Sequence, residues 1–320
     1  MHRSEARRIQ RQPTRKMKDL LLKQLNKVEQ IANFSKIGRF LHQPFKYGSA
    51  ILHRILIYPY TKKEIEVTTE IFFGREMHLA LPASIDIYLT GGKSHSSEIR
   101  LARYLILSLR ENDHFLDIGA HFGYFTLLAN QLVGVGGQII SIEPSSKSFK
   151  LLRQNVDGLK NIRIYQKAVS NTTEPITFYE FPNLHSEYNT SDVTQFENDS
   201  WYRQSPPVKV TVEATTIDEL VKTGSFCPHI IKMDVEGAEY QALQGGINFL
   251  CSGSPQVIME YVEPKRKNEN HKKSMDLLLS LGYVGHVIQS DGSLQAIIEV
   301  DSYLTRQGLE SDNLVFIKAI

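Results

Sequence analysis

The sequence predicts an α/β protein built on a Rossmann-like, doubly wound and mostly parallel β-sheet. From residue 114 onward, short apolar runs typical of buried strands alternate with helix-length stretches, which indicates βαβ units. Two of these runs end in an acidic residue, Asp117 and Glu143, and a glycine turn follows the first. The 320 residues, 41% hydrophobic and 22% charged, are enough to bury a sizeable core.

The composition argues against several classes of function. A formal net charge of +2 is too small to indicate a nucleic-acid-binding protein. The two cysteines, Cys227 and Cys251, form no C-x-x-C motif, so the sequence predicts no structural metal site and a reducing, cytoplasmic location. Every apolar run is shorter than the roughly 18 residues that a membrane-spanning helix needs.

The first 92 residues are expected to precede a main domain at 93–320. Residues 1–16 are basic and predicted to be disordered. From Met17 to Ile31, apolar residues recur at helical spacing, which predicts an amphipathic helix. For residues 17–45, packing on the protein's own core, contact with a second subunit in a homo-oligomer and peripheral membrane contact remain open alternatives. In this 17–92 accessory region, β-branched and aromatic runs predict short strands at 51–60, 64–73, 77–81 and 85–89.

A buried strand and a glycine turn form the centre of the predicted site. The run from His114 to Thr126 reaches Asp117, turns through a G-x-x-x-G pattern from Gly119 to Gly123, and continues as a helix. Glycines let backbone N–H groups at the helix start point at an anionic group, while Asp117 would face a cationic one. The zwitterionic end of S-adenosylmethionine suits this pair, whereas the G-x-G-x-x-G pattern of dinucleotide sites is absent. For the glycines alone, an ordinary strand-to-helix turn is the alternative.

A second strand, 138–143, ends at Glu143, 26 residues after Asp117. In doubly wound sheets an acid at this point binds the ribose hydroxyls of a nucleoside, so Glu143 is the predicted ribose ligand. Further strands are expected at 162–168, 229–235 and 256–262, followed by two more at 283–289 and 313–318.

Several motifs in order resemble the FkbM-type S-adenosylmethionine-dependent methyltransferases. They are FLDIGAHFGYFTLLA, IEPSSKSFKLLRQNV, TTIDEL and IIKMDVEGAEYQALQGG, and the resemblance covers roughly residues 90 to 265. It implies a class I methyltransferase fold with a C-terminal antiparallel strand, and it implies that Ala168 and Val169 lie against the adenine. His121 departs from the pattern, because such proteins usually carry Asn there. Together, the predicted cofactor-binding residues are Asp117, Gly119, Ala120, His121, Gly123, Tyr124, Glu143, Pro144, Ala168, Val169 and Asp234.

Four carboxylates are the predicted catalytic residues. Asp234, Glu236 and Glu239 lie within six residues, and Glu260 ends the next strand. Carboxylates this close repel one another unless they share a proton or a cation, so one of them is expected to act as a base. They also suit Mg²⁺, although a base without a required metal is the favoured interpretation. Alternatively, Glu236 and Glu239 only stabilise the start of a helix.

An insertion at 182–207 is predicted to be the acceptor-binding loop, because its aromatic residues alternate with Asn, Ser and Asp, although a plain mobile loop remains the alternative. The resemblance implies an enzyme that methylates a hydroxyl of a sugar, glycan or related small metabolite. A protein or nucleic-acid methyltransferase that uses its basic arm, and a non-catalytic S-adenosylmethionine-binding protein, are the alternatives.

Overall fold

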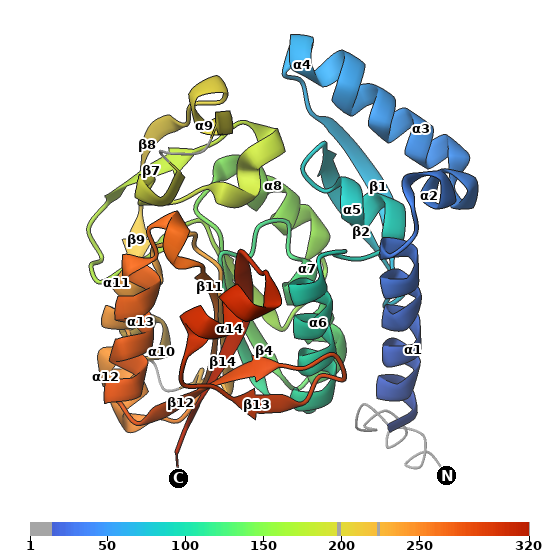
Figure 1. Cartoon of the computed structure of the whole chain (residues 1–320). Helices are drawn as coiled ribbons and strands as arrows, with labels where there is room; N and C mark the ends of the chain where they lie inside the picture. Colours follow the sequence, from blue (N-terminus) through green and yellow to red (C-terminus); the bar gives the residue numbers. More distant parts are fainter. Residues whose placement is uncertain (1–14, 197–199, 223–224, 320) are drawn as a thin grey trace, which may run out of the picture.

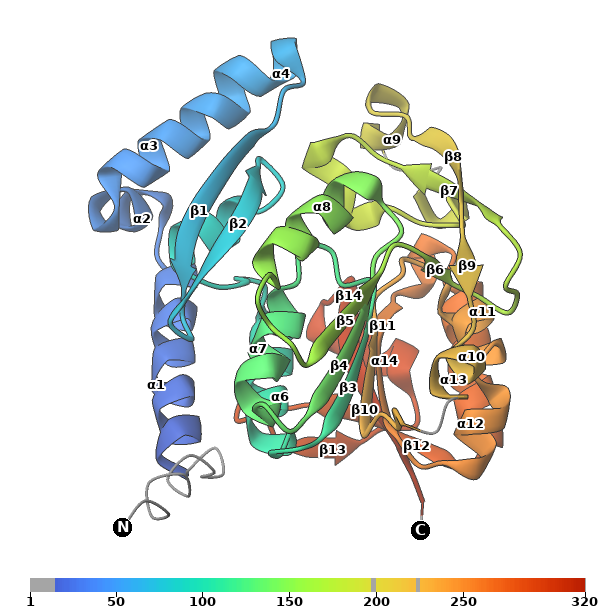
Figure 2. The ribbon, with the colours of Figure 1, turned by 180° about the vertical axis from the view of Figure 1, so that it is seen from behind.

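The computed structural model describes residues 15–196, 200–222 and 225–319. Its centre is an eight-stranded sheet with the strand order β13-β12-β14-β11-β10-β3-β4-β5 (Figures 1 and 2). The strands are β3 (His114–Ile118), β4 (Gln138–Ile142), β5 (Ile162–Tyr165), β10 (Ile230–Met233), β11 (Gln256–Val262), β12 (Tyr283–Ile288), β13 (Leu294–Ala296) and β14 (Ser311–Lys318). The five strands from β5 to β11 are parallel, whereas β14 pairs antiparallel with both β11 and β12. The predicted fold class and its antiparallel C-terminal strands are confirmed.

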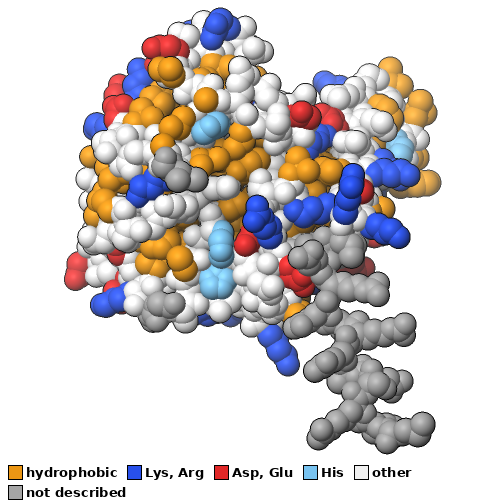
Figure 3. All heavy atoms as spheres, turned by 90° about the horizontal axis from the view of Figure 1, so that it is seen from below, with side chains coloured by type: hydrophobic (Ala, Val, Ile, Leu, Met, Phe, Trp, Pro, Cys, Tyr) orange, Lys and Arg blue, Asp and Glu red, His pale blue; other side chains and the backbone are white. Residues whose placement is uncertain are grey.

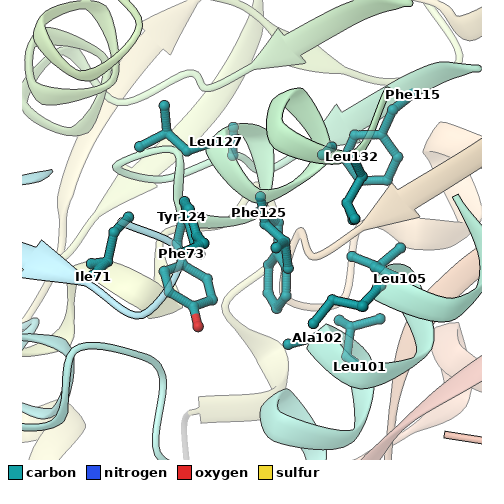
Figure 4. Packing of buried hydrophobic residues seen from close by; sticks show 14 of the residues in the cluster. Ile71, Phe73, Leu101, Ala102, Leu105, Phe115, Tyr124, Phe125, Leu127 and Leu132 are labelled. Carbon is teal, nitrogen blue, oxygen red and sulfur yellow. The ribbon is translucent and has the colours of Figure 1, made fainter. Parts of the chain in front are cut away.

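Helices cover both faces of the sheet. On one face lie α6 (Ser96–Ser108), α7 (Tyr124–Val133) and α8 (Ser146–Asn155); on the other lie α10 (Ile217–Val221), α11 (Glu239–Gln244), α12 (Ile247–Ser252), α13 (Glu269–Ser280) and α14 (Val300–Gln307). A short 3-10 turn, η4 (Pro264–Arg266), precedes α13. Side chains alternate along each strand, so Phe115 packs with α6 and α7 (Figure 4), whereas the next residue, Leu116, belongs to the core on the opposite face.

The predicted third strand is divided in two. After β5, the chain leaves the main sheet and forms β6 (Ala168–Val169), which pairs in parallel with β9 (Ala214–Thr215). Between them, β7 (Ile176–Glu180) and β8 (Val208–Val212) form an antiparallel hairpin. The described residues of the insertion at 182–207 form three short helices, η2 (Asn183–Tyr188), η3 (Thr194–Phe196) and α9 (Ser200–Gln204).

The predicted amphipathic helix is α1 (Arg15–Ala32), and it packs on the protein's own core. Leu21 and Leu25 are buried against the main domain. The Lys18 Nζ donates to the carbonyls of Leu107 and Leu109, which satisfies acceptors at the C-terminal end of α6. Of the basic arm predicted at 1–16, residues 1–14 lie outside the described residues.

Two of the predicted accessory strands are wrong. The segment 51–60 is helical, within α3 (Pro44–Leu52), the π-helical η1 (His53–Ile57) and α4 (Tyr58–Thr61), which follow α2 (Lys36–His42). Pro44 at the first turn of α3 favours a helix, and burial follows a helical period through Ala50, His53 and Tyr58. The segment 85–89 belongs to α5 (Ile85–Thr90), which ends where Gly91 adopts a φ of +76°.

The other two accessory strands are confirmed as the antiparallel pair β1 (Ile65–Ile71) and β2 (Arg75–Leu81). None of the helices in the described ranges is long and apolar enough to cross a membrane.

Candidate active site

A hollow opens to solvent at the carboxyl ends of the central strands, with about 660 Å³ of empty space when the solvent at its mouth is included. The chain runs from β3 to β4 and β5 in one direction and from β10 to β11 in the other, so the strand order reverses between β3 and β10. Ligands of doubly wound sheets bind at this switch point. Of the predicted cofactor-binding residues, those that line the hollow are Gly119, His121, Glu143, Pro144, Ala168, Val169 and Asp234.

Gly119 brings the ends of β3 and β10 together. It adopts a φ of +74°, and a Cβ added to it would lie 1.9 Å from the carbonyl oxygen of Asp234. Only glycine therefore fits here without moving one of the two strands. Next in the turn, His121 has a φ of +51°, a conformation in which Asn and His are enriched among side-chain-bearing residues. His121 and the Asn that the resemblance implies at this position therefore both suit this backbone conformation.

The Glu143 carboxylate is fixed on the wall of the hollow. It accepts hydrogen bonds of 2.9 Å from the backbone N–H groups of His121 and Ser145, and the residue is only 5% exposed. Burial raises the pKa of Glu143 to about 7, although the two N–H groups act in the opposite direction. A carboxylate oriented in this way retains acceptor positions for hydroxyl groups of a ligand.

A buried lysine links two of the predicted residues. Lys232, 3% exposed, places its Nζ 3.2 Å from Asp234 Oδ2 and 3.7 Å from Asp117 Oδ1. Burial opposes ionisation of Asp234, but the ammonium groups of Lys232 and Lys93 outweigh it and lower the pKa of Asp234 below its ordinary value. Asp234 is therefore held as a carboxylate at the edge of the hollow.

Asp117 lies behind the wall of the hollow and is fully buried. Its Oδ2 accepts a hydrogen bond of 2.6 Å from the Thr126 hydroxyl, and burial raises its pKa. In the described part of the chain, the lining residues of the hollow do not include Asp117, Ala120, Gly123 or Tyr124. Gly123 instead lets α7 approach Leu152 of α8, and the ring of Tyr124 packs beside Phe73 in the core (Figure 4).

Three of the predicted catalytic carboxylates converge beside the hollow. Asp234, Glu236 and Glu260 each present an oxygen within 4.8 Å of the others, an arrangement that can share a proton or hold a hard cation. Burial, followed by repulsion from Asp234, raises the pKa of Glu260 to about 7. Burial and the charge of Glu260 raise the pKa of Glu236 well above its ordinary value. At neutral pH Glu236 therefore retains its proton beside an ionised Asp234, whereas Glu260 is partly ionised.

Glu239, also predicted to be catalytic, is buried behind this group and stabilises the turn after β10. Its two oxygens accept hydrogen bonds from the backbone N–H groups of Val235 and Gly237. The turn holds Glu236 at a φ of +52°, a conformation that costs free energy for a residue with a side chain. Glu239 thus contributes to the orientation of Glu236.

The sequence did not point to three charged residues on the wall, Lys93, Lys167 and Glu187. Lys93 follows Gly91 and Gly92 in the chain, and its Nζ lies 2.8 Å from Glu98 Oε2. Burial lowers the pKa of Lys93, but Glu98 and Asp234 outweigh it and raise the pKa. Burial raises the pKa of Glu187, which belongs to the insertion, to about 7.

The aromatic residues of the insertion contact one another. The Trp201 ring stacks on His185 with the ring centroids 4.2 Å apart and lies 5.2 Å from the ring of Tyr188. The side chains that the insertion contributes to the hollow are polar: Ser186, Glu187, Asn189 and Ser191. The acceptor-binding role of this loop stays a prediction. What supports it is the hydrogen-bonding capacity of these polar side chains rather than ring stacking.

Comparisons with known proteins address the chemistry of this site. Residues 117–284, more than half of the chain, match the profile of the "Methyltransferase FkbM domain". A Thermoplasma volcanium protein named "Probable cobalt-precorrin-6B C(15)-methyltransferase (decarboxylating)" is 34% identical over 92 residues, which cover 28% of this chain and 46% of that protein. The hexuronic acid methyltransferase AglP of Haloferax volcanii is 25% identical over 152 residues, 47% of this chain and 56% of that protein.

Among solved structures, the methyltransferase FkbM from Methylobacillus flagellatus is similar with a TM-score of 0.40 and 14% identity, over 73% of this chain and 52% of that one. The chain thus spans about half the length of these relatives.

Proposed function

The chain belongs to the methyltransferase FkbM family, and on this premise we propose that it transfers a methyl group from S-adenosylmethionine to a hydroxyl of a sugar, glycan or related small metabolite. The resemblance read from the sequence motifs is confirmed by the family match.

The walls of the hollow fit S-adenosylmethionine. Glu143 is oriented to accept hydrogen bonds from ribose hydroxyls, and Ala168, Val169 and Phe178 offer an apolar surface to adenine. Lys93 and the ionised Asp234 supply opposite charges for the carboxylate and the ammonium of the methionine end. When bound, this cofactor supplies a methyl group on a sulfonium, which is an excellent leaving group.

The observation that carries the proposal is the group of three carboxylates beside the hollow. A hydroxyl must lose its proton as it attacks a methyl carbon, so a base with a pKa near the working pH is effective. Glu260, with a pKa of about 7, meets that condition. Glu260 would accept the hydroxyl proton, and bound S-adenosylmethionine would supply the methyl group and leave as S-adenosylhomocysteine. Asp234 remains ionised throughout because Lys232 compensates its charge.

The acceptor class is supported by the polar wall of the insertion. Ser186, Asn189 and Ser191 offer hydrogen-bond donors and acceptors, which suits a ligand with many hydroxyl groups. The likeness to a protein named as a hexuronic acid methyltransferase supports the same class. We place the enzyme in the cytoplasm, because Cys227 and Cys251 are both free and exposed, as is usual in a reducing compartment.

Calorimetric titration with S-adenosylmethionine, S-adenosylhomocysteine and NAD, with and without Mg²⁺, tests the cofactor. Binding of the two sulfur compounds alone supports the proposal, whereas binding of NAD alone contradicts it. Transfer of a labelled methyl group to neutral sugars and to uronic acids then tests the acceptor. Labelled ether products support O-methylation, whereas label found only in protein or nucleic acid refutes the acceptor class. Activity that survives chelation of divalent ions supports base catalysis without a required metal.

A further inference from the structure

The segment α2–α4 presents a large apolar surface to solvent. Of the eighteen large hydrophobic side chains that are exposed in the described residues, ten lie between residues 34 and 60. Phe45 is 91% exposed, and Ile37 and Leu41 are each 73% exposed. The ten residues are Phe34, Ile37, Phe40, Leu41, Phe45, Leu52, Ile55, Leu56, Ile57 and Tyr60, and we call them the apolar patch. Patches of this extent mark interaction sites on a folded protein.

The charged residues within the segment that carries the apolar patch all have one sign. Between Glu29 and Glu64 the sequence contains no Asp or Glu. It contains six basic residues in this interval: Lys36, Arg39, Lys46, Arg54, Lys62 and Lys63. Viewed from below, the outer edge of the molecule on the side of α2 and α3 shows hydrophobic side chains together with Lys and Arg side chains (Figure 3). The surface is therefore both apolar and cationic.

The inner side of this segment is fixed to the rest of the protein. Ala50 and His53 are buried, and the His53 Nε2 lies 3.1 Å from the carbonyl oxygen of Lys63. The Tyr58 hydroxyl accepts a hydrogen bond of 3.1 Å from the backbone N–H of Leu184 in the insertion. The apolar patch is consequently held on the outer side of an anchored helical arm.

We propose that the apolar patch docks onto an anionic lipid bilayer surface, with α2, α3 and α4 lying in the interface. An amphipathic surface with basic residues beside exposed Phe, Leu and Ile binds such membranes through buried apolar area and attraction to anionic headgroups. A second copy of the chain fits less well, because a symmetric contact would bring the same six cationic residues together without any acidic partner in the segment.

The full-length protein should be tested by flotation with vesicles of phosphatidylcholine alone and with vesicles that also contain phosphatidylglycerol. Binding is expected only to the anionic vesicles. It should weaken as NaCl is raised from about 0.1 M to about 1 M, which shortens the Debye length from about 10 Å to about 3 Å. The double variant L41S/F45S should lower the partition coefficient roughly tenfold or more, since two apolar side chains no longer enter the interface.

A matched control is V135S/I298S, because these side chains are 91% and 89% exposed and lie outside the apolar patch. The control should bind vesicles as the wild type does, and both variants should unfold at the wild-type temperature because the substituted side chains are exposed. Equal binding by L41S/F45S and the wild type would overturn the proposal. So would failure of the wild type to float with anionic vesicles, or a dimer in sedimentation equilibrium that L41S/F45S dissociates without any vesicle binding.

Discussion

The contact between Gly119 and the carbonyl of Asp234 yields a prediction that can be tested against a second glycine of the chain, Gly158. Replacing Gly119 by Ala places a methyl group where the backbone oxygen of Asp234 lies 1.9 Å away, at a φ of +74°. Gly158 has almost the same φ, +76°, but a Cβ added there meets nothing within 4 Å. The two substitutions therefore share the conformational penalty and differ only in the steric overlap.

The magnitudes follow from these two contributions. The left-handed conformation costs an alanine about 1–2 kcal/mol, which is the whole expected effect of Gly158→Ala. Gly119→Ala adds overpacking between β3 and β10, worth typically about 1–3 kcal/mol. At about 2 °C per kcal/mol for a chain of this size, the melting temperature should fall by about 2–4 °C in Gly158→Ala and by about 4–10 °C in Gly119→Ala.

Thermal and denaturant unfolding of both variants, followed by calorimetric titration with S-adenosylmethionine, provide the assay. Gly119→Ala should also weaken cofactor binding, because the shift separates the turn from Asp234, whereas Gly158→Ala should bind normally. If the two variants lose equal stability and bind the cofactor equally well, the packing argument for the G-x-x-x-G turn is refuted.

Three further predictions concern the charged residues. Glu143→Ala should lower the affinity for S-adenosylmethionine by at least about tenfold, since hydrogen bonds to a charged group contribute about 1.5–3 kcal/mol each. An unchanged affinity in calorimetric titration would contradict the assignment of Glu143 to the ribose. Lys232→Met should cost about 3–5 kcal/mol of unfolding free energy at pH 8. That loss of unfolding free energy should shrink on acidification, because the uncompensated Asp117 and Asp234 then take up protons. An equal loss at pH 8 and pH 5 would contradict the ion-pair account. The methyl-transfer rate should rise with pH and level off above about 7, because Glu260 then loses its proton. Glu260→Gln should lower this rate by a factor of about 10²–10⁴. A rate independent of pH between 6 and 8 would contradict Glu260 as the base.

Short local patterns in the sequence were sufficient to predict the strands of the main sheet. The strands that end near Asp117 and Glu143 lie within a residue or two of their predicted bounds, because continuous apolar runs between turn residues indicate buried parallel strands. The segment 51–60 misled because its Ile, Leu and Tyr residues have high β propensity, yet helical packing of Ala50, His53 and Tyr58 decided the structure. The β propensity of single residues predicts secondary structure least well where apolar residues stay exposed, as they do on this helical arm.

The residues of the site could be predicted from the sequence where a single motif contains both the backbone turn and the functional side chain. Glu143 and Asp234 end their strands, so their places at the switch point follow from topology. Lys93 and Glu187 come from separate connections on either side of the sheet, and no spacing in the sequence relates them to the site. Asp117 illustrates the reverse case: its position at the strand end is as expected, but its side chain turns to Thr126 and Lys232.

The Lys232 side chain has a consequence for how this family of sequences can change. It is enclosed between Asp117 and Asp234, and buried charges of this kind are destabilising when one partner is lost but can often be exchanged as a set for neutral residues. Positions 117, 232 and 234 are therefore expected to be strongly epistatic: a neutral residue at position 232 alone is harmful, and it becomes tolerable once positions 117 and 234 have also become neutral. A library that varies these three positions together should recover folded proteins mainly among the variants in which all three are charged or all three are neutral.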